Sequence, residues 1–170
     1  VKISEIPSLE EITSGRIKLS DIKPVDVLDV LQRNTVKPDT SLLAKNIKDK
    51  VVMVTGAGGS IGSELCRQIL KQQPKALVLF ELSEYALYAI HSELQKLAKN
   101  MQQERQLPTV TPLYVHLGSV TNQKIIELLC NQYKVQTIYH AAAYKHVPIV
   151  ESNEYEGVIN NFVGTYNTLK

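Results

Sequence analysis

A cluster of glycines is the strongest chemical signal in this sequence. Four of the eight glycines in the 170 residues fall between Gly56 and Gly62, in the run Thr-Gly-Ala-Gly-Gly-Ser-Ile-Gly that begins at Thr55. A glycine-rich turn between a strand and a helix brings backbone N–H groups close to phosphates, because no side chain blocks the approach. The cluster therefore predicts a binding site for the pyrophosphate of a dinucleotide. The alternative is a glycine-rich turn that binds nothing.

Three glycines of the cluster have distinct expected roles. Gly56 permits a tight turn out of the strand, Gly59 lets the backbone approach the pyrophosphate, and Gly62 lets the following helix pack closely. The N–H groups and the positive dipole at the helix start then face the phosphates. A Walker loop fits less well, because no Gly-Lys-Ser/Thr sequence follows. The cofactor-binding residues predicted here are Gly56, Gly58, Gly59, Ser60, Ile61 and Gly62.

An acidic residue follows the glycines at the sequence separation that is typical of dinucleotide-binding folds. Glu81 ends the next apolar run, about 20 residues after the glycines, where an acid accepts hydrogen bonds from the adenosine ribose hydroxyls. A carboxylate at this position favours NAD and repels the extra phosphate of NADP, which is kept as the alternative cofactor. Glu84 lies close enough in sequence to share or take the role. The alternative is that Glu81 is a solvated glutamate at a strand end with no role in binding.

The elements that must position these residues follow from the apolar pattern after residue 49. Alternating buried runs and helical periodicity give four strand-helix units, which predict an α/β fold with a partial, Rossmann-type doubly wound parallel sheet. Ser83 and Thr121 are expected to cap helices. The last helix is expected to turn Val158, Phe162, Tyr166 and Leu169 inward. The predicted strands are 51–55, 76–81, 110–117 and 136–141, and the predicted helices are 60–72, 83–101, 122–133 and about 152 to the chain end.

Residues 1–48 lack the regular apolar pattern of the later residues. They are predicted to form an N-terminal arm or linker with short helices and extended stretches. Pro7, Gly15, Pro24 and Pro38 interrupt mixed charges there. Residues 49–170 are assigned to an NAD(P)-binding Rossmann domain. The first residue is Val rather than Met, so we expect the chain to be a piece of a longer protein.

Composition excludes several classes of function. The formal net charge is +2 and no segment is strongly basic, so nucleic acid is not an expected partner. Cys66 and Cys130 have no metal-ligand spacing, which predicts buried free thiols and no metal site. No apolar run approaches the ~18 residues of a membrane span.

Further motifs resemble a known family. The segment 137–148, Thr-Ile-Tyr-His-Ala-Ala-Ala-Tyr-Lys-His-Val-Pro, and the Asn-Phe-Val-Gly-Thr of 161–165 resemble motifs of the CapD-like polysaccharide biosynthesis group. This group belongs to the extended short-chain dehydrogenase/reductase superfamily and contains nucleotide-sugar dehydratases that act on UDP-N-acetylhexosamines. The segments 7–12, 25–31 and 83–88 are also similar, so the resemblance covers nearly the whole chain.

The resemblance implies further site residues. Small side chains at 141–143 would line the nicotinamide side of the cofactor, and 119–120 would lie at the adenine. Many relatives have Asp where this chain has Ser119, so the adenine contact would fall to a hydroxyl or a backbone group. Lys145 would bind the sugar or its phosphates, or else be a solvated loop lysine. The cofactor-binding residues added in this way are Ser119, Val120, Ala141, Ala142, Ala143 and Asn161.

The resemblance also implies a reaction, a 4,6-dehydration that starts and ends with hydride transfer. Hydride leaves C4 of the sugar, water is eliminated across C5 and C6, and hydride returns to C6. The catalytic residues are expected beyond Lys170. Residues 166–170 match Tyr-x-x-x-Lys but lie one strand-helix unit too early, so Tyr166 is assigned to core packing. His140 is interpreted as a core histidine with satisfied hydrogen bonds, and His146 as a packing partner of Pro148.

Two other functions stay open. A UDP-sugar 4-epimerase differs only in downstream catalytic residues and in its product, and a non-catalytic nucleotide-binding module would show no turnover. For the full-length protein the resemblance implies a homo-oligomer on the cytoplasmic face of the inner membrane.

Overall fold

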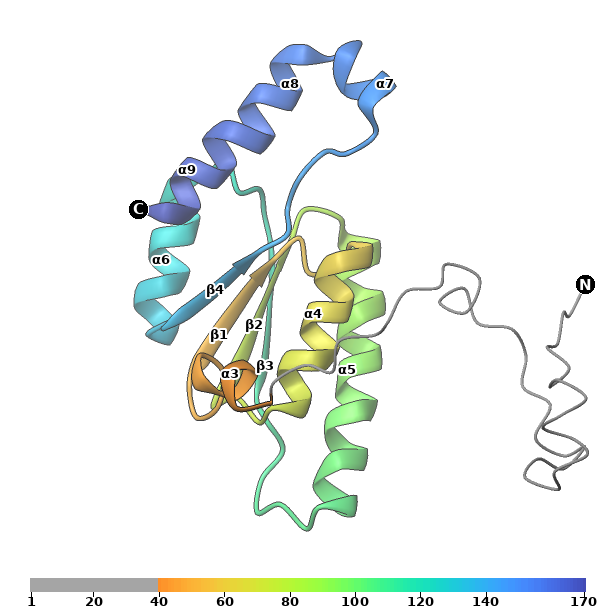
Figure 1. Ribbon diagram of the computed structural model, residues 1–170, viewed down its shortest axis with the longest axis vertical. Coiled ribbons are helices and arrows are strands. Elements are labelled where there is room, and N and C mark those ends of the chain that lie inside the picture. Colours follow the sequence, from red (N-terminus) through yellow and green to blue (C-terminus); the bar gives the residue numbers. More distant parts are fainter. Residues whose placement is uncertain (1–39) are drawn as a thin grey trace, which may run out of the picture. The chain divides into compact units, whose positions relative to one another are not determined.

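The computed structural model describes residues 40–170, and the predictions for residues 1–39 lie outside the described part. Its four strands form one parallel sheet in the order β3-β2-β1-β4 (Figure 1). This is the order of the first four strands of a Rossmann-type doubly wound sheet, and it confirms the predicted fold class. The strands are β1 (Val51–Thr55), β2 (Ala76–Glu81), β3 (Leu113–Leu117) and β4 (Thr137–His140).

The two central strands are buried on both faces, as their unbroken apolar sequences predict. Every residue of β1 is buried, and so is β2 from Ala76 to Phe80. The outer strands β3 and β4 are partly exposed. The strand predicted from Val110 begins only at Leu113, and the carbonyl of Pro112 accepts the N–H of Leu77 just before it.

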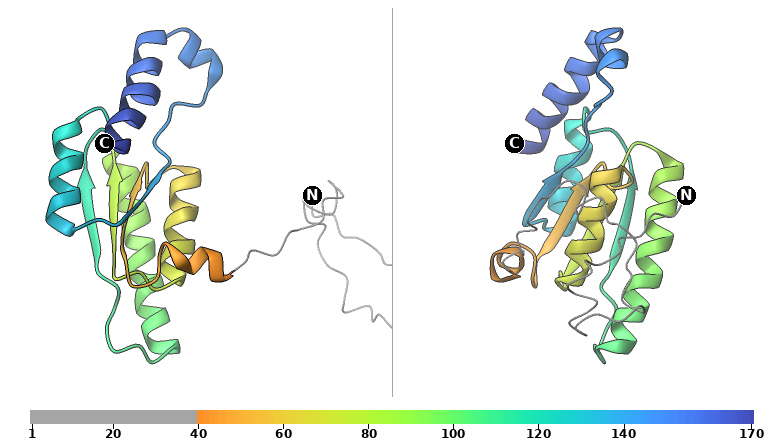
Figure 2. Two further views of the ribbon diagram at one scale, coloured as in Figure 1. Left: turned by 60° about the vertical axis from the view of Figure 1, so that its left-hand side comes forward. Right: turned by 45° about the vertical axis from the view of Figure 1, so that its right-hand side comes forward.

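Helices cover both faces of the sheet (Figures 1 and 2). On one face lie α4 (Ser60–Lys71) and α5 (Glu84–Glu104), and on the other lie α6 (Gln123–Tyr133) and α9 (Gly164–Leu169). Alternate strand residues feed two separate cores, with Val54 and Leu79 in the first and Met53 and Phe80 in the second. Before β1 comes the short helix α3 (Thr40–Lys45), and Ile47 after it is buried in the first core although its position falls in the predicted arm.

One of the two predicted helix caps is confirmed and the other is wrong. The Ser83 hydroxyl accepts the N–H of Ala86 at the start of α5. Helix α6 is capped by the Asn122 side chain, which accepts the N–H of Ile125. Thr121 lies one residue too early for this role, and its hydroxyl is hydrogen-bonded to Ser119 instead.

The prediction for the last helix is wrong in its orientation. The segment contains α7 (Val147–Glu151), α8 (Glu154–Val158), a π-helical turn (Ile159–Val163) and α9. Tyr166 is not in the core, and the Lys170 ammonium lies 4.5 Å from its ring centroid. The four residues expected to face inward are exposed, namely Val158 (58%), Phe162 (69%), Tyr166 (52%) and Leu169 (81%).

Small and polar residues occupy the inner face of this segment instead. Gly157, Asn160, Gly164 and Asn167 are buried. A Cβ at Gly164 would lie 2.5 Å from Cγ2 of Val120, and Asn167 Nδ2 donates to the carbonyls of Val120 (3.1 Å) and Thr121 (3.0 Å). The helix thus meets the chain after β3 at very close range, so its inward face needs small side chains and hydrogen-bond donors.

This orientation predicts an unusual order of mutational effects in the 170-residue chain. Asn167→Ala should lower the free energy of unfolding by about 1–3 kcal/mol, because two backbone carbonyls lose their donor. Phe162→Ala should change it by less than about 0.5 kcal/mol, because that side chain is mostly exposed. Urea denaturation of both variants measures the two effects, and a larger loss for Phe162→Ala would contradict this orientation.

Residues 40–170 can also be searched for membrane-spanning helices, metal-binding groups and free thiols. Between residues 40 and 170 no helix combines the length and apolarity needed to cross a membrane. The same residues contain no group of His, Cys, Asp and Glu that could hold a metal ion. Both cysteines are free, but only Cys66 is fully buried, and its burial raises the pKa of the thiol to about 12.

Candidate functional site

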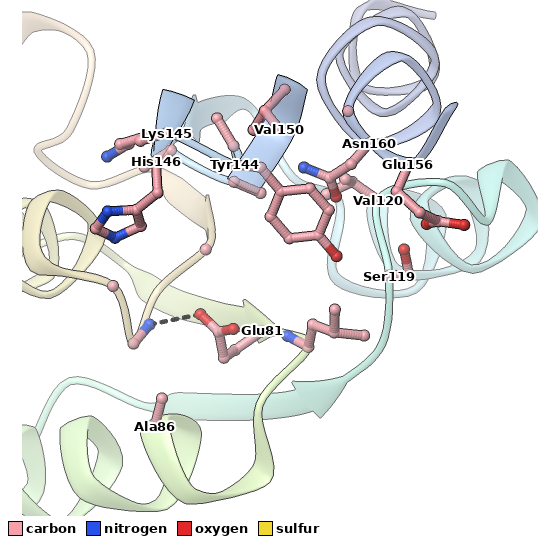
Figure 3. Close-up of a pocket in the computed structure, with 18 of the residues that line it drawn as sticks. Glu81, Ala86, Ser119, Val120, Tyr144, Lys145, His146, Val150, Glu156 and Asn160 are labelled. Atoms are coloured by element: carbon pink, nitrogen blue, oxygen red, sulfur yellow. Dashed lines mark hydrogen bonds between the residues drawn. The ribbon is translucent and has the colours of Figure 1, made fainter. Parts of the chain in front are cut away.

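A cavity of about 600 Å³ opens beside the carboxyl ends of the strands (Figure 3). The loops after all four strands contribute to its wall, together with α7 and α8. This edge is where doubly wound sheets bind ligands. Ten predicted site residues line the cavity, namely Gly56, Gly58, Gly59, Glu81, Ser119, Val120, Ala141, Ala142, Ala143 and Lys145.

Four predicted site residues do not line the cavity: Ser60, Ile61, Gly62 and Asn161. The first three form the opening turn of α4, whose N-terminus has no side-chain cap. Within the described residues, their N–H groups have no recorded acceptor. Such N–H groups are the ordinary donors to a phosphate at a helix start, so these residues can offer backbone donors rather than side chains.

Two glycines hold the loop in its tight shape. Gly56 has a φ of +65°, and a Cβ there would also lie 2.7 Å from the backbone N of Ala142. A Cβ at Gly62 would lie 1.9 Å from the carbonyl oxygen of Gly56. The missing side chain of Gly62 therefore makes room for the glycine loop itself. The sequence had assigned Gly62 only to close packing of the helix.

The remaining two glycines of the loop differ from each other. A Cβ at Gly58 would lie 2.5 Å from Cβ of Ala86, so Gly58 lets the loop touch the first turn of α5. This contact joins elements distant in sequence and was not predicted. Gly59 is open, because an added Cβ would lie 3.4 Å from its nearest neighbour, and Gly59 lines the cavity. Gly59 is therefore the glycine whose absent side chain leaves space for a ligand.

Glu81 is fixed at the floor of the cavity by three backbone donors. Its Oε2 accepts the N–H of Gly58 at 2.9 Å, drawn as the dashed line in Figure 3. Its Oε1 accepts the N–H groups of Leu82 (2.9 Å) and Ser83 (3.0 Å). The carboxylate thus links the end of β2 to the glycine loop. Of the two acids predicted for the ribose contact, Glu81 lines the cavity and Glu84 does not.

Asn161 acts on the cavity through the backbone of Tyr144. Its Oδ1 accepts the Tyr144 N–H (2.8 Å) and its Nδ2 donates to the Tyr144 carbonyl (3.0 Å). Asn160 Nδ2 also donates to Asn161 Oδ1. The π-helical turn carries both asparagines, and π turns are frequent at functional sites. Asn161 therefore positions the loop after β4 and does not itself line the cavity.

His140 connects the sheet to the last helix, and its hydrogen bonds define one tautomer. The Thr165 hydroxyl donates to the carbonyl of Asn161, so it accepts from Nε2–H of His140 at 3.0 Å. Nδ1 then accepts from the buried Thr55 hydroxyl at 2.7 Å. The interpretation as a core histidine with satisfied hydrogen bonds agrees with these contacts, and burial lowers the pKa of the ring.

This network predicts a pH dependence of stability. Because the folded-state pKa of His140 lies below the ordinary 6.5, the unfolded chain binds more protons near pH 6. Stability should therefore be full above pH 6.5 and fall as the pH drops below it. Burial lowers the pKa of His116 in the same direction. Urea midpoints at pH 7.5 and 5.5 should differ more for the wild type than for His140→Gln, and equal differences would contradict the assignment.

Several cavity residues were not predicted as site residues. His146 lies beside the predicted Lys145 at one end of the cavity, and the Tyr144 ring projects between these two residues and Asn160 (Figure 3). Glu156 and Asn160 reach the cavity from one side of the last helical segment, four residues apart. Their helical spacing, continued at Gly164, was a usable signal, but the more regular apolar stripe of the same helix favoured the opposite side.

The family of the chain follows from comparison with known proteins. A family model described as "Polysaccharide biosynthesis protein" matches residues 52–170. The chain belongs to this family. It is 38% identical over 167 residues to the capsular polysaccharide biosynthesis protein CapD of Staphylococcus aureus, a match that covers 98% of this chain and 26% of that protein.

Two further relatives extend the comparison. The chain is 38% identical over 168 residues to the probable polysaccharide biosynthesis protein EpsC of Bacillus subtilis, again with 98% of this chain and 26% of the relative covered. It therefore spans about a quarter of the length of these curated relatives. A UDP-glucose-4-epimerase structure from Stenotrophomonas maltophila, with bound NAD and formylated UDP-arabinopyranose, matches with a TM-score of 0.56 and 18% identity. That match covers 71% of this chain and 32% of the epimerase, and it supports the Rossmann-type fold.

Proposed function

We propose that this chain is the NAD-binding part of a nucleotide-sugar 4,6-dehydratase of surface polysaccharide biosynthesis, with a UDP-N-acetylhexosamine as substrate. The observation that carries the proposal is the Glu81 carboxylate, held beside the glycine loop by the N–H of Gly58 at the floor of the cavity. A phosphate-binding loop and a ribose acceptor then share one wall, as a dinucleotide requires.

The residues present fit a dinucleotide. The first N–H groups of α4 supply donors for a pyrophosphate, and the open side of Gly59 leaves room for it. Glu81 supplies acceptors for two ribose hydroxyls. Ala141, Ala142 and Ala143 follow β4 and line the cavity with small side chains, where a flat nicotinamide ring can lie against the backbone.

NADP fits this site less well than NAD. The N–H groups of Leu82 and Ser83 are the natural donors to a 2′-phosphate at the end of β2, but both already donate to Oε1 of Glu81. A 2′-phosphate would therefore meet a carboxylate and find its donors occupied. Repulsion and loss of donors act in the same direction, which supports NAD as the cofactor.

The proposed reaction needs hydride chemistry and a positioned sugar. A bound nicotinamide would supply the acceptor for the C4 hydride and the donor to C6 after water leaves across C5 and C6. In this chain, Lys145 lies at the cavity end near the glycine loop, where its ammonium can bind the substrate's phosphates or hydroxyls. We propose that the proton-transferring residues belong to the region of the full-length protein that corresponds to the part of the relatives not matched by this chain.

Product analysis tests the proposal. The full-length protein that carries this chain should convert UDP-N-acetylglucosamine to a product lighter by one water, detected by mass spectrometry. A product of unchanged mass with inverted C4 would replace the dehydratase with a 4-epimerase, and UDP-glucose 4-epimerases are among the relatives, at 30% identity over 121 residues. NAD binding without any turnover would favour a non-catalytic module.

A further inference from the structure

The cavity has two distinct ends, separated by Glu81. In Figure 3 the glycine loop, Lys145 and His146 lie toward one side, and Ser119, Val120 and Glu156 lie toward the other. If the pyrophosphate binds the glycine loop and the ribose binds Glu81, as the proposed function requires, the base extends away from the loop. The base is attached to C1′ of the ribose, and the phosphate is attached at the other end of the sugar, through O5′. The adenine ring therefore reaches the end formed by Ser119, Val120 and Glu156.

This end of the cavity offers apolar surface, and an adenine bound there would need a hydrogen-bond acceptor for its amine. Leu82 and Val120 line the cavity and can pack against the faces of a flat base. The exocyclic amine of adenine carries two N–H donors. A donor that is removed from water without gaining an acceptor weakens the binding of the dinucleotide. An acceptor on this part of the wall would distinguish adenine from a base with a carbonyl at the same position.

Two other polar side chains at this end already take part in hydrogen bonds. The Ser119 hydroxyl is hydrogen-bonded to the Thr121 hydroxyl (2.8 Å) and also accepts the Thr121 N–H (3.2 Å). The Asn160 side chain is buried and tied to Asn161 by its amide nitrogen. Both side chains are thus held by local structure.

Glu156 is in a different situation. Its side chain is exposed and lines the cavity, and within residues 40–170 its carboxylate takes part in no recorded hydrogen bond or ion pair. In Figure 3 the carboxylate lies at the same end as the Ser119 hydroxyl. A carboxylate has acceptor sites only, so it suits an amine and repels a carbonyl.

We propose that the Glu156 carboxylate accepts a hydrogen bond from the exocyclic amine of adenine and so selects adenine-containing dinucleotides. The proposal rests on the proposed NAD site and names the residue that determines its base specificity. Glu156 thereby supplies from α8 the acidic group that the end of β3, with Ser119, lacks.

The test compares NAD with nicotinamide hypoxanthine dinucleotide, which has a carbonyl oxygen in place of the amine. Calorimetric titration of the wild-type chain should show NAD binding about 10-fold more tightly than the hypoxanthine analogue. In Glu156→Gln the preference should fall to about 2-fold or less, because a glutamine amide can turn to donate to the carbonyl. The matched control is Glu154→Gln, an exposed acid outside the cavity, which should keep the wild-type preference.

The outcomes separate this inference from the proposed function. NAD binding with an unchanged preference in Glu156→Gln would overturn the role of Glu156 and leave the NAD site standing. An equal loss of preference in Glu154→Gln would also overturn it, because a general charge effect would then explain the result. No NAD binding by the wild-type chain would overturn both the NAD site and the role of Glu156.

Discussion

Alanine in place of Glu81 is expected to weaken NAD binding by about 10- to 100-fold, because the ribose hydroxyls lose charge-assisted hydrogen bonds. The same change should improve NADP relative to NAD by about 100-fold. It removes the carboxylate that repels a 2′-phosphate and frees the N–H groups of Leu82 and Ser83, which donate to Glu81 in the wild type. Titration of both nucleotides against the wild type and the variant measures both effects.

Glu84→Ala is the matched control for Glu81→Ala. Glu84 is also acidic and lies three residues later, but it does not line the cavity. NAD affinity in this variant should stay within about 2-fold of the wild type, as expected for a weak exposed interaction. A loss at Glu84 equal to that at Glu81 would mean that the two acids share the ribose, which the three backbone contacts of Glu81 argue against.

Alanine in place of Gly62 should damage both the fold and the cofactor site. The new Cβ would lie 1.9 Å from the carbonyl oxygen of Gly56, so the loop or α4 must move. We expect a loss of about 1–3 kcal/mol in the free energy of unfolding, as for other overpacked sites. NAD affinity should fall by about 100-fold or more, because the displaced N–H groups no longer converge on the pyrophosphate. Urea denaturation and NAD titration measure the two effects.

Gly59→Ala separates packing from binding. A Cβ there has no neighbour closer than 3.4 Å and the backbone has an ordinary φ of −70°, so stability should be nearly unchanged. If the open side of Gly59 receives the pyrophosphate, NAD affinity should still fall by about 10-fold, because a methyl group then occupies that space. Unchanged NAD affinity in a stable Gly59→Ala variant would remove Gly59 from the phosphate site.

Local patterns predicted the sheet and the glycine loop well, for a physical reason. Buried parallel strands need unbroken apolar runs, and 51–55 and 76–81 have them, so type and boundary were readable. Glu81 was predicted as a site residue because its position follows from the length of one strand-helix-strand unit. The N–H of Gly58 that donates to Glu81, however, depends on how the glycine loop folds over the end of β2, which no local pattern contains.

The last helix shows where such prediction fails. Its apolar stripe is the most regular one on the helix, yet the buried side is the one with Gly164 and Asn167, because the chain after β3 passes too close for larger side chains. Hydrophobic periodicity assumes that a helix packs on side chains, and here it packs on backbone carbonyls as well. The same error concealed Glu156 and Asn160, which share that side of the helix and face the cavity.

Titration of the 170-residue chain with NAD and NADP is the most direct test of the dinucleotide site. We predict saturable binding of one NAD per chain, with NADP weaker by at least about 10-fold because of Glu81. NAD affinity should fall by about 100-fold or more in Gly62→Ala. Absence of saturable NAD binding by a folded chain, or NADP binding as tight as NAD, would contradict the assignment of this cavity.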